Sequence, residues 1–384
     1  MLFEFATSGR VVFGAGTSDQ LTERVRSYGR RPFLVSGASA ERYRYWVDEC
    51  KRCDLETAWF RVSGEPDTAT VASALEQARE HNADVVIAIG GGSVIDTGKV
   101  VSALLTNPGD LSRYLEVVGE GKPITEQPVP YIAVPTTAGT GSEATKNAVI
   151  SVPEERVKVS VRSPLMLPNC AIVDPSLTLT SPARVTATSG LDALTQLIEA
   201  FTSRKATPMT DGFCREGLSR AGRSLRQVWQ NPGNERARED MALASLFSGI
   251  ALGNAGLGAV HGFAGPLGGL TGAPHGAICA ALLGPVTRAN LRALESHGNG
   301  DLTVDRYREA AALVTGNDRA ATGDLLEWIL ETVSMLEVQS LSYLGLDEAT
   351  IPEAVAKARK SSSMKGNPVT LDEDELAHIL KVAL

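Results

Sequence analysis

The hydrophobic pattern changes character near the middle of the chain. Before residue 180, short apolar runs typical of buried strands alternate with segments of helical periodicity. The predicted strands span residues 32–36, 57–62, 84–89 and 129–134, and the predicted helices 39–53, 67–81 and 93–106. Such alternation is typical of a parallel sheet whose crossover helices pack on its faces. Apolar runs at 148–151 and 157–161 predict a hairpin appended to this sheet.

Beyond residue 180 the pattern is helical throughout. Alanine is frequent and runs of β-branched residues disappear, which favours helices over strands. Ser181-Pro182 begins the first helix, where proline is well tolerated. We therefore expect two domains, an α/β domain over residues 1–180 and an all-α domain over 181–384. The predicted helices are 186–202, 208–228, 235–252, 277–294, 303–314, 322–336, 348–362 and 372–384.

Length and composition agree with two globular domains. The chain has 384 residues, of which 43% are hydrophobic and 21% charged, so it can bury a sizeable core. A net charge of −8 is a poor match for nucleic acid or an anionic membrane. No apolar run reaches the roughly 18 residues of a membrane span. The N-terminus also lacks a secretory pattern.

The five cysteines indicate a reducing compartment. They are odd in number and scattered, unlike a disulfide framework, so we expect a cytoplasmic protein. Cys50 and Cys53 have the spacing of a redox or zinc motif. They lie in a charged, helical stretch without a second pair, however, and we interpret them as part of a surface helix.

Glycine is abundant and clustered in this chain. The 37 glycines are roughly 10% of the residues, against an average near 7%. They gather at 90–92, at 139 and 141, and over 249–276. Because glycine has no Cβ atom, such clusters indicate places where the backbone approaches something closely.

Two of these clusters follow predicted strands. Gly90-Gly91-Gly92 joins a strand to a helix, and the unpaired amides of a helix start suit a pyrophosphate. The segment 134–143, VPTTAGTGSE, follows the next strand and contains two glycines and four hydroxyl residues. Loops at the carboxyl ends of parallel strands are where ligands bind in α/β proteins. A plain turn is the alternative for each segment.

The helical half contains a candidate metal site. Asp192 and Gln196 are four residues apart and share one helix face. His261 and His275 flank the glycine-rich stretch 262–276, which we expect to be a loop. Two histidines and a carboxylate suit a catalytic Zn²⁺ or an open Fe²⁺ site. Spacing alone does not bring these residues together, and hydrogen-bonded core histidines are the alternative.

Four motifs together resemble the iron-containing alcohol dehydrogenase family, which includes maleylacetate reductases and is related to glycerol dehydrogenases. The similarity runs from about residue 8 to the C-terminus, and its most specific part is the segment 134–143. It implies a dehydroquinate synthase-like architecture, in which the active site lies between a Rossmann-like dinucleotide-binding domain and a helical metal- and substrate-binding domain. The motifs are Gly90-Gly91-Gly92-Ser93 with Asp96, VPTTAGTGSE at 134–143, Asp174-Pro175 after Ala171-Ile172-Val173, and His261 with Pro274-His275-Gly276.

The resemblance also implies a reaction and roles for single residues. Hydride would pass between NAD(H) or NADP(H) and an alcohol or carbonyl carbon, while Fe²⁺ or Zn²⁺ polarises the oxygen. The implied metal ligands are Asp192, Gln196, His261 and His275, and Asp96, His261 and His275 would be catalytic. A homodimer is implied as well. The implied cofactor-binding residues are Gly37, Ser39, Gly91, Gly92, Ser93, Thr136, Thr137, Thr140, Ser142, Asn147 and Lys158.

Three positions depart from the family pattern. Gln196 stands where relatives have a third histidine ligand, and an amide oxygen binds a first-row metal more weakly, so bound metal would be weak, exchangeable or absent. Gly265 replaces a histidine thought to lie beside the substrate. Gly37 stands where NAD-preferring relatives often carry an aspartate that repels a 2′-phosphate, so NADPH is permitted. Ser39 nearby could help to hold that phosphate.

We therefore predict an NAD(P)-dependent alcohol dehydrogenase that acts mainly as a reductase of a small aldehyde or ketone. A catalytically altered, metal-independent nucleotide-binding protein is one alternative, and a sugar-phosphate cyclase-type lyase is another. The charge of the substrate stays open. Lys146, Lys158 and Arg162 would suit an anionic substrate, but Lys158 could serve the cofactor while the other two are solvated strand residues.

Overall fold

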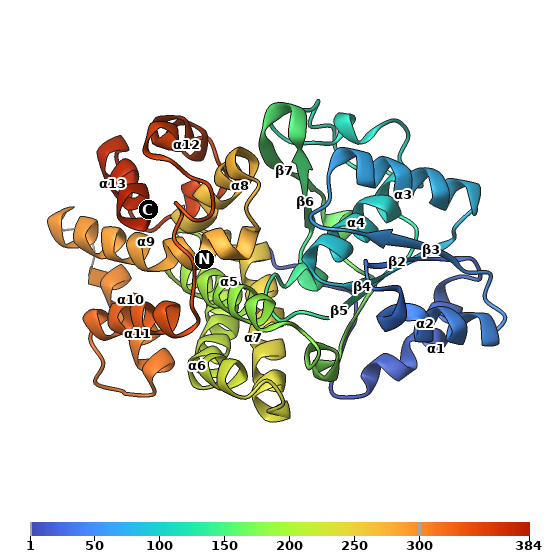
Figure 1. Ribbon diagram of the computed structural model, residues 1–384, viewed down its shortest axis with the longest axis horizontal. Coiled ribbons are helices and arrows are strands. Elements are labelled where there is room, and N and C mark those ends of the chain that lie inside the picture. Colours follow the sequence, from blue (N-terminus) through green and yellow to red (C-terminus); the bar gives the residue numbers. More distant parts are fainter. Residues whose placement is uncertain (1, 298–300) are drawn as a thin grey trace. The chain divides into compact units, whose positions relative to one another are not determined.

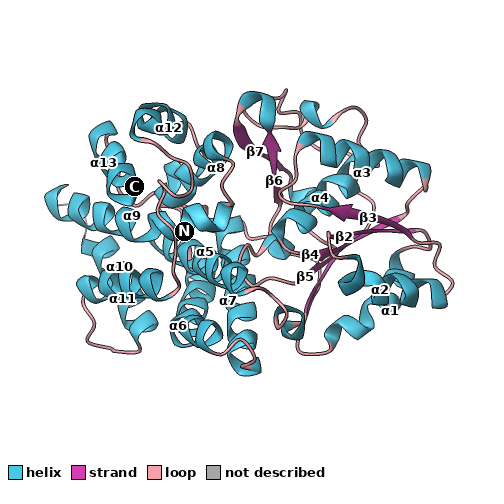
Figure 2. Cartoon of the chain, in the orientation of Figure 1, coloured by secondary structure: helices cyan, strands magenta, loops and turns pink. Residues whose placement is uncertain are grey.

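The chain forms two compact units. The computed structural model describes residues 2–297 and 301–384 (Figures 1 and 2). We call Ala6–Thr137 with Gly141–Thr180 the sheet unit. The helical unit comprises the described residues up to Phe5, the segment Ala138–Thr140, and Ser181–Leu384. Three residues of the segment 134–143 therefore belong with the helical unit, which the sequence pattern does not indicate.

The sheet unit contains a six-stranded parallel sheet, so the predicted α/β class is confirmed. The strand order is β1-β8-β5-β4-β2-β3, and every neighbouring pair is parallel. Strands β1 and β8 escape prediction because runs of three or four residues carry too little periodicity. The bounds are β1 Val11–Phe13, β2 Pro32–Gly37, β3 Ala58–Val62, β4 Val85–Gly90, β5 Tyr131–Pro135 and β8 Cys170–Val173.

Helices cover both faces of this sheet. Leu34 and Ile87 face a core shared with helices α1 and α2, whereas Phe33 and Val86 face one shared with α3 and α4. Burial on both faces explains why these strands are continuously apolar rather than alternating. The bounds are α1 Leu21–Tyr28, α2 Ala40–Arg52, α3 Thr68–Glu80 and α4 Gly92–Leu104.

Two predictions about this unit need correction. Cys50 lies on the predicted helix but is fully buried in the core with α1, so it is not a surface residue. The predicted hairpin is present as β6 (Asn147–Val152) and β7 (Val157–Arg162), but it forms its own antiparallel sheet rather than extending the main one. Its inner face packs on α4 instead.

The helical unit is arranged around α5. From Thr186 to Thr202 nearly every residue of α5 is buried, and the helix packs against α6, α7 and α9. A helix buried all round can carry polar side chains only where they find partners. The bounds are α5 Ala183–Thr202, α6 Pro208–Gln230, α7 Glu235–Ala255, α8 Ala259–Thr271, α9 His275–His297, α10 Asp301–Thr315, α11 Thr322–Met335, α12 Ile351–Ala358 and α13 Glu373–Ala383.

The glycine-rich stretch 262–276 is not the expected loop. Most of it belongs to α8, and His275 begins α9. A Cβ atom on Gly276 would lie 2.8 Å from the Thr188 carbonyl oxygen, so the start of α9 needs glycine for its close approach to α5. The predicted helix 348–362 also differs, because a 3₁₀ turn at Glu348–Thr350 precedes α12, which ends at Ala358.

Helix α7 meets α8 at a sharp break. The two helices are bent by 98° there, and together they have the length and composition of a broken membrane span. Within residues 2–297 and 301–384, no single helix is long and apolar enough to cross a membrane.

Candidate active site

The glycine turn after β4 begins a helix directly against the strand. Gly91 caps the N-terminus of α4 in an extended conformation. A Cβ atom on Gly90 would lie 2.6 Å from the Val94 Cβ atom, so only glycine allows this approach. Gly91, Gly92 and Ser93 are half-buried, and amides of a first helical turn have no partner within their helix. The turn therefore has the form of an anion site at a helix N-terminus.

The loop that follows β5 begins beside this turn. The Thr136 amide donates to the Gly90 carbonyl over 2.9 Å, and a Cβ atom on Gly91 would contact Thr137 at 3.4 Å. Thr136 and Ser142 are buried, whereas Thr137 and Thr140 are half-buried. The structure thus places the start of the second predicted loop next to the first, while contacts of these four residues with a cofactor stay predictions.

A buried lysine ties helix α4 to the chain that follows the second loop. Lys99 is 1% exposed, and sequence analysis missed it although it lies one turn after Asp96 in an apolar helix. The Asp96 Oδ2 atom accepts a hydrogen bond from the Val149 amide at 2.8 Å. The Lys99 ammonium donates three hydrogen bonds, of 2.9, 2.9 and 2.7 Å, to Ser142 O, Thr145 Oγ1 and Asn147 O.

Burial also moves the pKa values of Lys99 and Glu143 towards neutral pH. It lowers the pKa of Lys99 to about 8, although the nearby Asp96 and Glu143 carboxylates favour its charged form. Burial raises the pKa of Glu143 to about 7, and the charge of Lys99 offsets this only in part. Two buried groups of opposite charge therefore change protonation within the physiological range.

The hairpin separates two of the predicted cofactor residues. Lys158 pairs with Ser151 and Asn147 pairs with Arg162, so Asn147 and Lys158 lie at opposite ends, about 13 Å apart. Lys158 forms an ion pair with Glu65, and Arg162 forms one with Glu116 at 3.4 Å. Lys158 and Arg162 therefore already have carboxylate partners.

Gly37 and Ser39 lie at the carboxyl end of β2. Gly37 is the last residue of the strand and is half-buried, whereas Ser39 is exposed and precedes α2. A Cβ atom on Gly37 would lie 3.1 Å from the Tyr43 hydroxyl.

In the helical unit, three helices bring the predicted metal residues together. Asp192 Oδ1 on α5 lies 3.3 Å from His261 Nε2 on α8 and 3.8 Å from His275 Nε2 on α9. The buried thiol of Cys279 joins them, and the four ligand atoms all lie within 4.8 Å of one another. Cys279 was not predicted from the sequence, although its position four residues after His275 on one helix face was the available signal.

Gln196 contacts this cluster through its amide nitrogen. The Nε2 atom donates to Asp192 Oδ2 at 2.9 Å, and the Oε1 atom accepts from the Ser248 hydroxyl at 2.6 Å. Its predicted role as a metal ligand stays a prediction.

Glu199 orients His261 from the same face of α5. Its Oε2 atom lies 2.6 Å from His261 Nδ1, and its Oε1 atom accepts from the Val260 amide at 2.7 Å. With the proton on Nδ1, the Nε2 lone pair of His261 faces Asp192, as in carboxylate–histidine–metal sites. Glu199 was not predicted from the sequence, although it lies two helical turns after Asp192.

The residues of this cluster shift one another's pKa values. Burial opposes charge on its members, but the charges and polar groups of their neighbours outweigh it, so the pKa of Asp192 is lowered and that of His261 is raised well above its usual range. For His275, burial is likewise outweighed, chiefly by Cys279, and the pKa rises to about 9. The His275 side chain is 29% exposed, so solvent reaches the cluster there.

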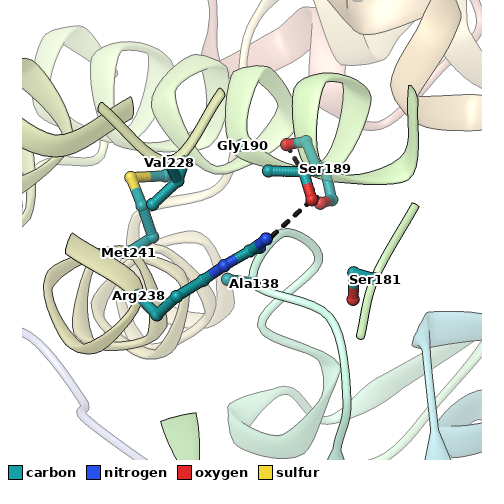
Figure 3. A pocket seen from close by; sticks show the side chains of 8 residues that line it. Ala138, Ser181, Ser189, Gly190, Val228, Arg238 and Met241 are labelled. Carbon is teal, nitrogen blue, oxygen red and sulfur yellow. Dashed lines mark hydrogen bonds between the residues drawn. The ribbon is translucent and has the colours of Figure 1, made fainter. Parts of the chain in front are cut away.

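A separate cavity in the helical unit is too small for a substrate. It lies beside the buried Arg238 side chain, with Ala138, Ser181 and Ser189 in its wall (Figure 3). Arg238 Nη1 donates to the Thr186 hydroxyl at 3.1 Å. The volume of about 10 Å³ has room for roughly one water molecule.

Known proteins resemble both units. Residues 8–175 match the iron-containing alcohol dehydrogenase model, and residues 186–384 match the C-terminal model of the Fe-containing alcohol dehydrogenase family. The chain is 35% identical to the 1,3-propanediol dehydrogenase of Klebsiella pneumoniae, over 100% of this chain and 99% of that one.

Solved structures agree with these matches. A 1,3-propanediol oxidoreductase has a TM-score of 0.91 at 32% identity, covering 100% of both chains. A sulfoacetaldehyde reductase from Bifidobacterium kashiwanohense, solved in complex with NAD⁺, has a TM-score of 0.86 at 26% identity, covering 100% of this chain and 99% of that one. These similarities do not support the two alternative functions, a sugar-phosphate cyclase-type lyase and a non-catalytic nucleotide-binding protein. The chain belongs to the iron-containing alcohol dehydrogenase family, and it is an oxidoreductase that interconverts alcohols and carbonyl compounds.

Proposed function

We propose that this enzyme uses NAD(H) or NADP(H) and a divalent ion, and that it acts mainly as a reductase of small aldehydes or ketones. The cluster of Asp192, His261 and His275 carries the proposal, because its ligand atoms converge inside the helical unit. The NAD⁺ complex of the related sulfoacetaldehyde reductase supports the class of cofactor.

The donor atoms suit a divalent ion. Among the described residues, the buried Asp192 Oδ1 atom accepts no hydrogen bond, although both imidazole Nε2 atoms lie within 3.8 Å of it. A carboxylate and two imidazoles are ligands for Zn²⁺ and Fe²⁺. When bound, the ion would polarise the carbonyl oxygen and stabilise the alkoxide that forms as hydride arrives. Glu199 would keep His261 in the tautomer that offers Nε2.

The sheet unit would bind the dinucleotide. The amides of Gly91, Gly92 and Ser93 suit its pyrophosphate, because they stand at the N-terminus of α4. Asp96 holds the Val149 amide and so fixes β6 against α4, which supports a positioning role beside the nicotinamide. We assign contacts with the rest of the cofactor to Gly37, Ser39, Thr136, Thr137, Thr140, Ser142, Asn147 and Lys158.

An uncharged substrate fits the charges better than an anionic one. Lys158 and Arg162 are already paired with Glu65 and Glu116, which leaves less unbalanced positive charge on the hairpin. Gly265 lies one turn after His261 on α8, where its lack of a side chain leaves room for a larger substrate.

We also propose a cytoplasmic homodimer. All five cysteines are free, which supports a reducing compartment. The dimer rests on family resemblance alone, and size-exclusion chromatography with light scattering would test it.

Steady-state turnover tests the proposed reaction. Purified protein with NADH or NADPH, added Zn²⁺ or Fe²⁺ and a panel of small aldehydes should oxidise the reduced cofactor. Asp192→Ala should lower kcat about a hundredfold or more, since it removes the ligand between both histidines. The affinity for the cofactor should stay unchanged.

Asp305→Ala, which removes an exposed carboxylate on α10, is the control and should turn over like the wild type. Full activity of Asp192→Ala contradicts the metal mechanism. Absence of turnover in either direction, with every cofactor, metal and substrate of the panel, contradicts the proposed function.

A further inference from the structure

The cluster of Asp192, His261, His275 and Cys279 contains one sulfur donor, which differs chemically from the carboxylate and the two imidazoles. Cys279 is fully buried, and its Sγ atom lies 3.7 Å from His261 Nε2. It stands one turn after His275 on α9, so both side chains lie on the same face of that helix. The thiol is therefore part of the convergent set rather than a chance neighbour of one histidine.

Gln196 is arranged to position Asp192 rather than to bind an ion. An amide N–H group can donate a hydrogen bond but cannot ligate a cation, and it is the N–H side of Gln196 that meets Asp192 Oδ2. The amide oxygen is the atom that could bind a metal, and it accepts from the Ser248 hydroxyl instead. Gln196 therefore occupies one oxygen of Asp192, while Oδ1 remains directed at the two histidines.

The charges of the four donors also balance a divalent cation. A carboxylate and a thiolate together carry two negative charges, and the two imidazoles bind as neutral groups. Glu199 accepts the Nδ1 proton of His261, which leaves Nε2 free to ligate. The four donors and a bound divalent ion would together carry no net charge, whereas the buried Glu199 carboxylate beside them would add one negative charge that its hydrogen bonds stabilise.

We propose that Cys279 is the fourth protein ligand of the divalent ion, bound as a thiolate, and that it makes the site selective for Zn²⁺ over Fe²⁺. Gln196 lies outside the coordination sphere and holds Asp192 in place. The thiol proton is released to solvent as the sulfur–metal bond forms. Thiolate donors favour zinc over harder ions, which gives the preference its chemical basis. The proposal rests on the proposed metal role of Asp192, His261 and His275.

Cobalt spectroscopy tests the ligand set without requiring turnover. The metal is removed with a chelator, and Co²⁺ is added back to the folded protein. Wild-type protein should show a near-ultraviolet sulfur-to-cobalt charge-transfer band that saturates at one ion per chain. Cys279→Ser should lose this band and bind Zn²⁺ about tenfold more weakly or worse. Cys53→Ser, at the half-buried residue that follows α2, is the matched control and should keep the band.

The variant Gln196→Leu separates the support of Asp192 by Gln196 from metal ligation by Cys279. It should keep the charge-transfer band with a lower affinity for Co²⁺, because only the support of Asp192 is lost. In competition between equal concentrations of Zn²⁺ and Fe²⁺ without oxygen, the wild type should retain Zn²⁺, and Cys279→Ser should lose at least tenfold of that preference.

Each outcome decides the proposal. Stoichiometric Co²⁺ binding by the wild type without a charge-transfer band overturns thiolate ligation but leaves the proposed function standing. A band that survives in Cys279→Ser, or one that disappears in Gln196→Leu while Co²⁺ stays bound, also overturns it. Absence of any metal binding overturns both this proposal and the metal mechanism. The wild-type spectrum alone is decisive should Cys279→Ser fail to fold.

Discussion

Gly37, the last residue of β2, is one of the residues proposed to contact the cofactor. It provides no carboxylate there, and a Cβ atom would lie 3.1 Å from the Tyr43 hydroxyl, so a side chain fits after a small shift of that ring. Gly37→Asp should therefore lower kcat/KM for NADPH relative to NADH about tenfold or more, because a carboxylate repels a 2′-phosphate. Steady-state kinetics with both cofactors measure the ratio.

Gly37→Asn is the control for this change, since it has nearly the same shape without the charge. If both variants shift the cofactor ratio equally, the effect is steric, and the charge explanation is wrong.

Glu143 gives the stability of the protein a pH dependence. Burial raises its pKa from 4.5 to about 7, so the folded protein keeps a proton that the unfolded chain has released. The stability that this group contributes is fully present below pH 4.5 and is lost as the pH rises through 7. The free energy of unfolding should therefore fall more steeply between pH 5 and 7.5 in the wild type than in Glu143→Gln, as measured by urea denaturation at several pH values.

Glu155→Gln changes an exposed carboxylate in the turn between β6 and β7 and should leave the slope as it is. Parallel curves for the wild type and Glu143→Gln would show that Glu143 does not keep its proton near neutral pH.

At the scale of whole elements, packing decides which glycines a helix needs. Two glycines of helix α6, Gly212 and Gly222, differ in their surroundings. A Cβ atom on Gly212 would meet nothing within 4 Å, whereas one on Gly222 would lie 2.3 Å from the Val314 carbonyl oxygen of α10. Gly212→Ala should thus stabilise the protein by about 0.5–1 kcal/mol through helix propensity. Gly222→Ala should destabilise it by about 1–3 kcal/mol, because α6 and α10 must separate.

Urea unfolding of both variants tests this pair, and each serves as the control for the other because the substitution and the helix are the same. Equal effects of the two changes would mean that propensity, rather than the contact between α6 and α10, governs glycine in this helix.

At the scale of the whole molecule, an ion bound to α5, α8 and α9 would join segments that are far apart in the chain. Any ligand of the folded state stabilises it by mass action, by about 2.7 kcal/mol when the free ligand is a hundred times its Kd. Removing the metal with a chelator should therefore lower the thermal midpoint, and Zn²⁺ in excess should restore it. Scanning calorimetry measures both changes.

Asp192→Ala should show a smaller difference in thermal midpoint between chelator and Zn²⁺ than the wild type, because one of the four proposed ligands is removed. A wild-type midpoint that does not respond to chelator and Zn²⁺ argues against a metal that links these helices.

Local periodicity was sufficient for the individual strands β2, β3, β4 and β5, the helical half and the loops after β4 and β5. Each of these features depends on residues close together in the chain, where apolar spacing and glycine already express the backbone geometry. The short strands β1 and β8 and the glycine-rich helix α8 were not predicted, because their local sequence patterns are weaker.

The proposed metal site of Asp192, His261, His275 and Cys279, by contrast, depends on how distant segments pack. Glu199 meets His261 across 62 positions of the chain, and Cys279 reaches His261 only because α8 and α9 pack together. Gln196 satisfies the spacing of a ligand, yet Ser248 on α7 receives its amide oxygen. Spacing restricts which side chains share a helix face, but the neighbouring helices decide which atoms of those side chains remain free to bind a ligand.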